Sequence, residues 1–548
     1  MVLLALSACT VSKPTPAVQV LLVCNGSTVA CPRGPHYLTV QSAADAASSG
    51  DWILIWPGIY HENNAEYHTG VLIAVPHLHV RGLSRSGVVI DGSSGSGRTP
   101  CPSSAARQNF APRNGIEVFR SDDVSIENLT VCNYLSGAYG SAGNQIWWNG
   151  GDASGMMEMR GFTGAFLTAT STYRPPDSAG KHDAQYGIYA GNTAGPGTIT
   201  DSYASNMAAA AFYVGACGRA CDTEVSADHG TNSGVGFLGT DAGGRLLLKA
   251  SIFDNNRTGI ELTSLNNDDG PPPQDGRCAG NRAAPCAFIE DNSVDDNNNA
   301  SAPSAFASIA VGVGISLDGG QFDTVTGNTI SRNGSWGVII GDSVGNLQGF
   351  SFSRCQGGYP NFPGSGLCLL PAVGNRVFGN KFSDDGAFGN PGNTDIANAT
   401  GLHGAARPPN CVYANVAAKG NLTSSPAGIE TAGGATGSCV SPGAADRAVL
   451  LTDLACGTLA VKCAMPYKRA PQSAGTPLAP FPRLSGMADP CAGIPPNPFC
   501  TGTHGQAGGD GDPRYVISLR GYSLYSPAVD FDERRDCSTF AVSGAVER

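Results

Sequence analysis

The sequence predicts an all-β solenoid, a fold in which short strands wind into coils that stack on one another. First, a short apolar phrase returns between Tyr186 and Asp342, and Ile188, Phe212, Gly236 and Ile260 follow one another at 24-residue steps. Second, polar turns containing asparagine precede most copies. Third, the chain has 74 Gly and only 14% charged residues, and helix-favouring stretches are almost confined to one short segment.

The repeated phrase is one strand of each coil. A single short strand can neither bury its apolar face nor pair its backbone, so successive coils must supply both. Because side chains alternate across a strand, one residue in two points inward. The expected inward residues are Ile188, Ala190, Phe212, Val214, Ile260, Leu262, Ile315, Leu317, Val338 and Ile340.

Around Gly236 the register is ambiguous by one residue, so Phe237 has no assigned side. The corner asparagines Asn206, Asn232, Asn256 and Asn333 are interpreted as structural, because asparagine tolerates left-handed backbone and bonds to its counterpart on the next coil.

The first nine residues resemble the end of a lipoprotein signal. Leu6-Ser7-Ala8-Cys9 matches the lipobox pattern, which would make Cys9 a lipidation site, although the apolar stretch is short and lacks a basic leader. A plain secretory signal or an uncleaved N-terminus is the alternative. Residues 10–36 are expected to form a Pro-containing leader that spaces the domain from its anchor.

An Ala-rich, helix-prone segment, Gln41 to Ala47, precedes the strand Trp52 to Ile55, and Val88-Val89-Ile90-Asp91-Gly92 follows. The run from Val40 to Glu62 resembles the entrance of right-handed parallel β-helix proteins of the pectate-lyase-like superfamily. In that family a helix caps the open end of the stack, which would otherwise expose strand edges. The resemblance therefore implies a right-handed parallel β-helix over 37–400 with an N-terminal capping helix. Residues 401–548, rich in Cys, Pro and Gly, are expected to form an irregular disulfide-tied cap or appendage.

The chain has 18 cysteines, too many for an ordinary reduced cytosolic protein, and their local pairing predicts disulfides in an oxidising, exported setting. The pairs expected from spacing are Cys24/Cys31, Cys217/Cys221, Cys278/Cys286, Cys355/Cys368, Cys456/Cys463 and Cys491/Cys500. Cys132, in an apolar run, is predicted to be a buried thiol. The net charge of −11 argues against nucleic-acid binding.

Outward residues of matching strands form columns, so one face of the stack displays functional groups along a groove. Acidic, aromatic and basic groups in one column suit a sugar chain, since rings stack on tyrosine and carboxylates bind hydroxyls. A solvated strand face is the plainer alternative. The expected column is Glu117, Glu158, Arg160, Tyr189, Tyr213, Glu261, Ser316 and Asp318, with Tyr189, Tyr213, Glu261 and Asp318 as substrate-binding residues.

A uronate lyase or epimerase is the leading hypothesis, and a glycoside hydrolase and a non-catalytic binding module are the alternatives. A uronate lyase or epimerase needs a cation and a base, which Lys181, His182 and Arg160 supply. A glycoside hydrolase needs two carboxyl groups, for which Glu117 and Glu158 are the candidates. A surface adhesin or structural glycan-binding module needs no catalytic group. All three predict an extracellular polysaccharide as partner.

The segment Asn266 to Gly276 is rich in oxygen ligands. Asp268, Asp269 and Asp275 within it are candidate ligands for calcium, which takes six to eight oxygens. An EF-hand pattern is absent, and a rigid loop without metal is the alternative. Calcium is accordingly the only cofactor that the sequence suggests.

Overall fold

A computed structural model describes residues 17–500 except 96–97, 138–141, 152–156, 177–181, 219, 266–285, 306–308, 346–354, 356–357, 363–366, 407, 431–438, 440–442, 459–462, 464–465 and 471–477. The chain divides into two compact units, 1–509 and 510–548, and every described residue belongs to the first.

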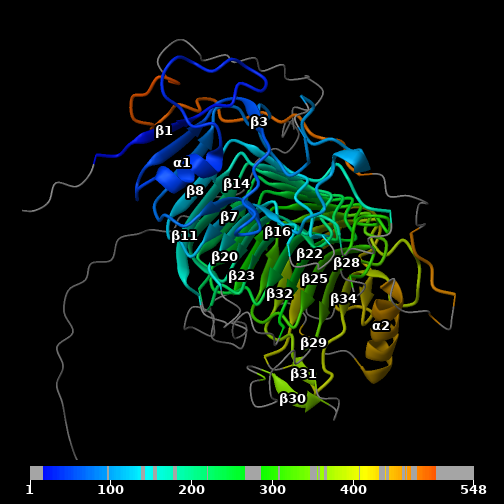
Figure 1. Cartoon of the computed structure of the whole chain (residues 1–548). Coiled ribbons are helices and arrows are strands. Elements are labelled where there is room, and N and C mark those ends of the chain that lie inside the picture. Colours follow the sequence, from blue (N-terminus) through cyan, green and yellow to red (C-terminus); the bar gives the residue numbers. More distant parts are fainter. Residues whose placement is uncertain are drawn as a thin grey trace, which may run out of the picture. The chain divides into compact units, whose positions relative to one another are not determined.

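The first unit is a parallel β-helix whose coils each contribute one strand to three parallel sheets (Figure 1). Sheet A contains β1 (Val20–Val23), β2 (Trp52–Ile55), β5 (His79–Gly82), β8 (Val124–Glu127), β11 (Met159–Ala165), β14 (Thr193–Thr200), β17 (Thr223–Ser226), β20 (Leu246–Lys249), β23 (Ala287–Glu290), β26 (Thr324–Thr326), β32 (Arg376–Phe378) and β35 (Cys411–Tyr413).

Sheet B contains β3 (Gly58–Tyr60), β6 (Val88–Asp91), β9 (Thr130–Cys132), β12 (Thr168–Thr170), β15 (Tyr203–Ser205), β18 (His229–Thr231), β21 (Ile252–Asp254), β24 (Ser293–Asp295), β27 (Thr329–Ser331), β33 (Lys381–Ser383) and β36 (Val416–Ala417). Sheet C contains β4 (Thr69–Ile73), β7 (Asn114–Phe119), β10 (Ile146–Asn149), β13 (Tyr186–Gly191), β16 (Ala210–Gly215), β19 (Val235–Thr240), β22 (Thr258–Thr263), β25 (Val313–Asp318), β28 (Trp336–Gly341), β34 (Thr394–Asn398) and β37 (Ser424–Ser425).

The core runs along the inside of the stack, and the predicted inward residues of the repeat all lie in it, each at most 1% exposed. The ambiguous copy is also resolved. Phe212 pairs with Phe237, which is fully buried, whereas Leu238 pairs with Tyr213 on the outer face. Phe237 therefore continues the inward column.

The predicted N-terminal cap is confirmed as helix α1 (Val40–Ala46). Val40, Ala43 and Ala44 are buried in the core. The Gln41 side chain donates to the Leu72 carbonyl at 3.2 Å and accepts from the Leu72 amide at 2.7 Å. Because β4 is the edge strand of sheet C, these two bonds satisfy backbone groups that would otherwise face an open edge.

Asparagine ladders hold the corners, as predicted for Asn256 and Asn333. Asn256 donates to Asn297 at 3.0 Å, Asn297 donates to Asn333 at 3.1 Å, and Asn333 donates to Asp385 at 2.9 Å. Asn232 likewise donates to Asn206 at 2.6 Å. Each bond joins neighbouring coils, so the ladders oppose a slip in register.

The C-terminal region is more regular than expected. Strands β35, β36 and β37 continue the three sheets beyond residue 400, and β1 begins sheet A before residue 37. Helix α2 (Ala444–Gly457), which was not predicted, packs Leu450 against the outer face of sheet C beside Trp336 and Ile339. Because many of its residues are alanine and the flanking sequence is rich in glycine, its larger apolar residues show no clear helical spacing. A small antiparallel sheet of β29 (Ser343–Gly345), β31 (Leu367–Leu370) and β30 (Tyr359–Phe362) and a short 3-10 helix, Ala105–Arg107, complete the elements.

A C-terminal strap, described over residues 466–470 and 478–500, lies along the coils. Lys468 exchanges two hydrogen bonds with Asn390 at 2.8 and 2.9 Å. Farther along, the Met487 amide donates to Asn128 at 2.9 Å, and Arg81 donates to the Ala492 carbonyl at 2.7 Å. The strap thus returns from late coils to early ones.

Disulfides staple the described chain in an arrangement close to the expected one. Five expected pairs are present: Cys24–Cys31, Cys217–Cys221, Cys355–Cys368, Cys456–Cys463 and Cys491–Cys500. The prediction of a free Cys132 thiol is wrong, because Cys132 is bonded to Cys101, 31 residues away. Cys411–Cys439 was also not predicted. Cys278 lies outside the described residues.

The seven disulfides among described residues indicate an oxidising, extracytoplasmic setting. Within the same residues, none of the helices has the length and apolarity needed to cross a bilayer. Cys9 lies outside them, so its lipidation stays a prediction.

One corner ladder contains an aspartate where its neighbours are asparagines, and this generates a prediction. Asn375 donates its side-chain amide to the Gly320 carbonyl and to Asn410. Asp323 occupies the preceding rung, is fully buried, and has one carboxyl oxygen without a partner among the described residues. Burial raises the pKa of Asp323 to about 8.

The variant Asp323→Asn is expected to be more stable than the parent above pH 8, by about 1 to 3 kcal/mol, because a neutral amide replaces a buried charge. A folded-state pKa above the unfolded value means that the native state binds the extra proton, so the parent loses stability as pH rises from about 4 to about 8. Urea unfolding at pH 5 and pH 9 measures the difference between the two proteins. A variant less stable than the parent at pH 9 would contradict this account.

Candidate functional site

The outer face of sheet C carries one continuous row of side chains across successive coils. Strand pairing aligns them one by one, so neighbours in the row are separated by the strand spacing of about 4.8 Å. In order, the row is Leu72, Glu117, Trp147, Tyr189, Tyr213, Leu238, Glu261, Ser316 and Ile339. The predicted alignment of Glu117, Tyr189, Tyr213, Glu261 and Ser316 is therefore confirmed.

Aromatic rings occupy the middle of this row. Trp147 and Tyr189 are stacked, with ring centroids 5.1 Å apart and an interplanar angle of 8°. Tyr213 meets Tyr189 edge to face at 4.6 Å, and Tyr186 contacts both tyrosines. Trp147, Tyr186 and Tyr189 are half-buried. We call Trp147, Tyr186, Tyr189 and Tyr213 the aromatic platform.

Glycines beside the platform make room for its rings. Two residues after each row tyrosine stands a glycine, Gly191 or Gly215, on the same face. A β-carbon at Gly191 would lie 2.6 Å from Tyr189 Cε2, and one at Gly215 would lie 2.5 Å from the Tyr213 hydroxyl. Any larger residue at these positions would therefore displace the rings.

Glu117 lies at the early end of the platform, beside Trp147. It is 8% exposed, and Asn114 and Asn149 donate to its carboxyl oxygens at 2.9 and 2.8 Å. Burial raises the pKa of Glu117, while the two amide hydrogen bonds oppose the shift. Two fixed amides hold this carboxyl in place.

Beyond the platform, three carboxyl groups from adjacent strands interact. Glu261 is on β22 and pairs with Ser316 on β25. Asp318 lies two residues after Ser316, and Asp342 directly follows β28. Burial raises the pKa of both Glu261 and Asp318, and the charge of Asp318 adds to the shift of Glu261 as the charge of Asp342 adds to that of Asp318. We call Glu261, Asp318 and Asp342 the acidic cluster.

The members of the acidic cluster have different surroundings. Within the described part of the chain, no hydrogen bond to the Glu261 carboxyl is found, and burial followed by the charge of Asp318 raises its pKa to about 8. Burial also raises the pKa of Asp318, to about 6, although hydrogen bonds from Thr263 and Ser343 favour its ionised form. Asp342 accepts from the amides of Ala372, Gly401 and Leu402 at 2.8 to 3.0 Å. Burial thus favours the neutral form of Glu261 without opposition from hydrogen bonds, whereas hydrogen bonds oppose the same effect at Asp318.

The spacing of the carboxyl groups follows from the ladder. Glu261 and Asp318 are one strand apart and two residues out of step, which places their α-carbons about 8 Å from each other. Glu117 and Glu261 are five strands apart, or about 24 Å. Only the first pair can act on the same bond.

Two predicted members of the column lie elsewhere. Arg160 is on β11, a strand of sheet A, and its side chain is exposed. Glu158 precedes β11 and forms an ion pair with Arg120 at 2.8 Å. The placement of both in the column was wrong because strand β10 belongs to sheet C and the next strand, β11, belongs to sheet A. No copy of the repeated phrase lies between Gly150 and Met159 to indicate which sheet the residues join. Their predicted roles stay untested, as does that of His182, which lies half-buried in the turn before β13.

Several other candidates fall outside the described residues. These are Lys181, the calcium candidates Asp268, Asp269 and Asp275, and Cys9. Among the described residues, the one group with the geometry of a metal site is Asp91 with Cys101 and Cys132. Those cysteines form a disulfide, which removes them as thiolate ligands.

Sequence reasoning missed Trp147, Leu238 and Asp342. The segment from Tyr134 to Asn149 contains no copy of the repeated phrase, but its last four residues form strand β10. Its pattern of Ile146 and Trp148 inside with Trp147 outside does alternate, and this signal could have identified the strand. Asp342 directly follows β28, which pairs with β25. Its closeness to Asp318 depends on that pairing, which the sequence alone does not show.

No protein-family model matches the chain, and no curated protein matches it either. Among solved structures, the chain is similar to the A-module of the mannuronan C-5 epimerase AlgE4 of Azotobacter vinelandii, with 13% identity, 69% of this chain and 89% of that chain covered, and a TM-score of 0.40.

It is also similar to the Dettilon tailspike protein, with 11% identity, 74% of this chain and 68% of that chain covered, and a TM-score of 0.38. A tailspike protein of E. coli bacteriophage HK620, in complex with a pentasaccharide, has 11% identity, coverages of 74% and 64%, and a TM-score of 0.36. These likenesses concern the fold.

The glycine positions yield a structural prediction. Gly191→Ala is expected to displace the Tyr189 ring and disrupt its stacking on Trp147, since the added carbon would lie 2.6 Å from the ring. The near-ultraviolet circular dichroism and the tryptophan emission should both change. Gly341→Ala is the matched control on the same face. The atom nearest to its added β-carbon is Asp318 Oδ1 at 3.9 Å, so the substitution displaces nothing. Spectra of Gly191→Ala that match those of the control would refute the proposed packing.

Proposed function

We propose that this protein is an exported glycoside hydrolase that cleaves a polysaccharide bound along the outer face of sheet C. The observation that carries the proposal is the pair Glu261 and Asp318, two carboxyl groups on one face of neighbouring strands. Burial raises the pKa of both, but among the described residues only Asp318 accepts hydrogen bonds that favour its ionised form. Such a divided pair is the arrangement that assigns one carboxyl as acid and the other as base.

In this mechanism Glu261 donates its proton to the glycosidic oxygen as the bond from that oxygen to the anomeric carbon breaks. Asp318 accepts a proton from a water molecule, whose oxygen forms the new bond to the anomeric carbon. Glu261 leaves the step ionised and Asp318 leaves it protonated, so one proton exchange with solvent restores both. Inverting enzymes hold their two carboxyl groups far enough apart to leave room for that water, and the two side chains project from neighbouring strands of one face.

The aromatic platform supplies the binding track that this chemistry needs. Trp147, Tyr189 and Tyr213 precede Leu238 and Glu261 in the same row, and aromatic rings offer apolar surface to the faces of sugar rings. Tyr213 and Leu238 are buried and pack with Ile309, so the sugar rings would stack on the half-buried Trp147 and Tyr189. Glu117, held by Asn114 and Asn149, would bind hydroxyls at the far end.

The row favours an uncharged glycan over a uronate. A lyase or epimerase must neutralise the substrate carboxylate with a cation, and none of the row residues from Glu117 to Ile339 is basic. The acidic cluster would also repel a polyanion. The uronate chemistry expected from Lys181 and His182 therefore ranks second.

Activity is expected to depend on pH as a bell. The rate should fall as pH drops below about 6, because Asp318 becomes protonated and loses its capacity as base. It should also fall as pH rises above about 8, because Glu261 loses the proton that it must donate. Release of reducing ends from a panel of neutral polysaccharides, followed between pH 4 and pH 10, measures the profile. An unsaturated product absorbing in the ultraviolet would instead indicate a lyase.

Glu261→Gln and Asp318→Asn are each expected to lower kcat by about 10²- to 10⁴-fold, the usual contribution of a general acid or base. Glu290→Gln provides a matched control, since burial also raises the pKa of Glu290 but the residue lies on sheet A. If glycan binding persists while no variant or parent protein ever releases product, the chain is a binding module.

Trp147→Ala is expected to raise KM about tenfold, equivalent to about 1.4 kcal/mol, with little change in kcat, because the platform binds substrate away from the reacting bond. The control is Trp52→Ala, which removes a tryptophan stacked on His79 in sheet A. Steady-state kinetics on an active substrate distinguishes the two. An equal effect of both variants would show that the platform has no specific role.

A further inference from the structure

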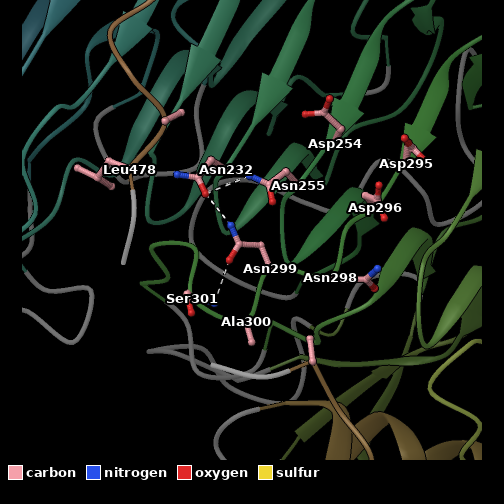
Figure 2. A pocket seen from close by; sticks show the side chains of 12 residues that line it. Asn232, Asp254, Asn255, Asp295, Asp296, Asn298, Asn299, Ala300, Ser301 and Leu478 are labelled. Carbon is pink, nitrogen blue, oxygen red and sulfur yellow. Dashed lines mark hydrogen bonds between the residues drawn. The ribbon is translucent and has the colours of Figure 1, made fainter. Parts of the chain in front are cut away.

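A pocket lies where the chain turns from sheet B to sheet C, away from the row described above. Figure 2 shows its lining, which comes from the ends of β18, β21 and β24, from residues 298–301 and from the strap. Its volume is about 690 Å³, within the range of small-ligand pockets.

The strap wall of the pocket is fixed to the coils. The Asn206 side chain donates to the Ala479 carbonyl at 3.0 Å and accepts from the Ala479 amide at 2.8 Å. Asn206 also accepts from Asn232, a lining residue, at 2.6 Å. Leu478, beside Ala479, adds an apolar side chain to the wall. The two sides of the pocket therefore share one hydrogen-bonded anchor.

Side-chain amides line the opposite side and hold one another in place. Asn299 donates to the Asn232 oxygen at 2.6 Å, and Asn255 donates to the same oxygen at 3.4 Å (Figure 2). The Asn255 side chain is exposed, and within the described residues its oxygen accepts no hydrogen bond. It thus presents a fixed acceptor to a ligand.

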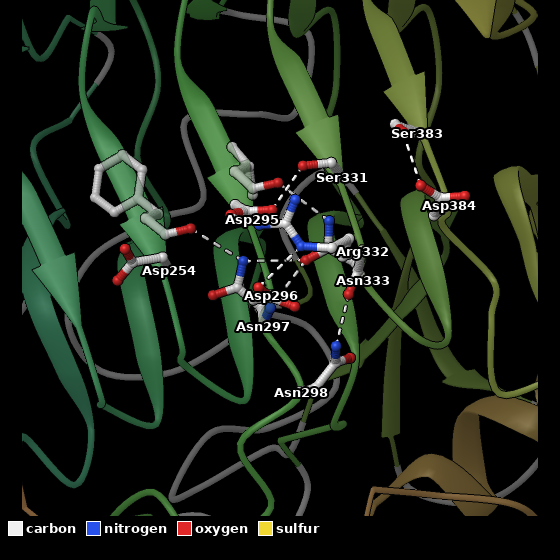
Figure 3. A network of polar contacts seen from close by, with 12 residues as sticks. Asp254, Asp295, Asp296, Asn297, Asn298, Ser331, Arg332, Asn333, Ser383 and Asp384 are labelled. Carbon is white, nitrogen blue, oxygen red and sulfur yellow. Dashed lines mark hydrogen bonds and ion pairs between the residues drawn. The ribbon is translucent and has the colours of Figure 1, made fainter. Parts of the chain in front are cut away.

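The carboxylates of the pocket already have basic partners. Arg332 forms ion pairs with Asp295 and Asp296 (Figure 3), and His229 contacts Asp254 at 3.1 Å. Among described residues, these aspartates do not form a group that could hold a metal ion. The lining therefore offers hydrogen-bond acceptors and donors, and because its three carboxylates outnumber the one guanidinium, it disfavours an anionic ligand.

A track of hydroxyls and carboxylates extends from the pocket across sheet B. Strand pairing aligns Thr231, Asp254, Asp295, Ser331 and Ser383 in one row. Because the row advances by about 4.8 Å per coil, successive polar side chains can meet successive residues of a linear polyol. The pocket and this track share Asp254 and Asp295.

We infer that this corner pocket binds an uncharged saccharide, as a second glycan site on a different sheet from the catalytic row. Asn255, Asp254 and Asp295 bind the hydroxyl groups, which both donate and accept hydrogen bonds, and Leu478 packs against an apolar sugar face. The pocket holds one stretch of a polysaccharide chain while another stretch is cleaved. The saccharide class follows from this lining and does not depend on hydrolysis at Glu261.

Affinity electrophoresis of the full chain tests the inference. All proteins carry Glu261→Gln, so that no polymer is consumed, and Trp147→Ala, so that the aromatic platform adds little retardation. The gels contain dextran, galactomannan or xylan as neutral probes and polygalacturonate as an anionic one, which should not slow the protein. We expect at least one neutral polymer to slow migration. Asp254→Ala, which removes a lining carboxylate, and Asp254→Phe, which also fills space, should each weaken that retardation about tenfold.

Two controls make the outcome specific. Glu224→Ala removes an exposed carboxylate that pairs with Lys249 on sheet A and should bind like the parent. Thermal melting checks that each variant is folded, and Asp254→Ala alone decides the matter if Asp254→Phe is not. The inference is overturned if no neutral polymer slows the protein or if Asp254→Ala binds like the parent. Loss of binding in Asp254→Ala with no hydrolysis by the unmutated protein would sustain this site and sink the proposed function.

Discussion

The in-register parallel stacking of coils is the constraint on which the rest of the structure depends. Inward side chains such as Phe212, Phe237 and Ile260 align along the core, and asparagine ladders bond neighbouring corners. A slip of one residue would turn every inward apolar side chain outward. The same register sets the outer row, so core packing and site geometry have one cause.

Burial on the outer face gives this row its chemistry. Leu238 lies directly before Glu261, helix α2 covers the later coils, and Asp318 and Asp342 crowd the acidic cluster. Partial removal from water favours the neutral form of Glu261, whereas hydroxyl groups favour the ionised form of Asp318. Two similar carboxyl groups are thereby biased toward different protonation states. An ordinary solvated strand face would leave both ionised.

Much of the fold could be predicted from the sequence because its repeat is local. The apolar positions of five copies, the capping helix and five disulfides all follow from short spacings. What failed depended on longer connections. Cys101 and Cys132 are 31 residues apart, α2 has a weak apolar pattern, and a long connection before Met159 hid the change of sheet that removes Arg160 from the row.

The site was predictable in part for the same reason. Tyr189, Tyr213, Glu261 and Asp318 belong to regular copies, so their outward direction was evident from alternation. The partnership of Glu261 with Asp318 was not, because burial and charge coupling arise only when strands separated by more than 50 residues become neighbours. Trp147 was not predicted because its strand, β10, was not recognised. The strand lacks the glycine that begins most copies of the repeated phrase.

The most direct test of the account is a crystal structure of Glu261→Gln with a bound oligosaccharide from an active polymer. The account predicts a sugar chain that crosses β10, β13, β16, β19 and β22 along the coil axis, with one glycosidic oxygen within about 3 Å of the residue 261 side chain. Sugar density that is absent from sheet C, and present only on other faces, would contradict it.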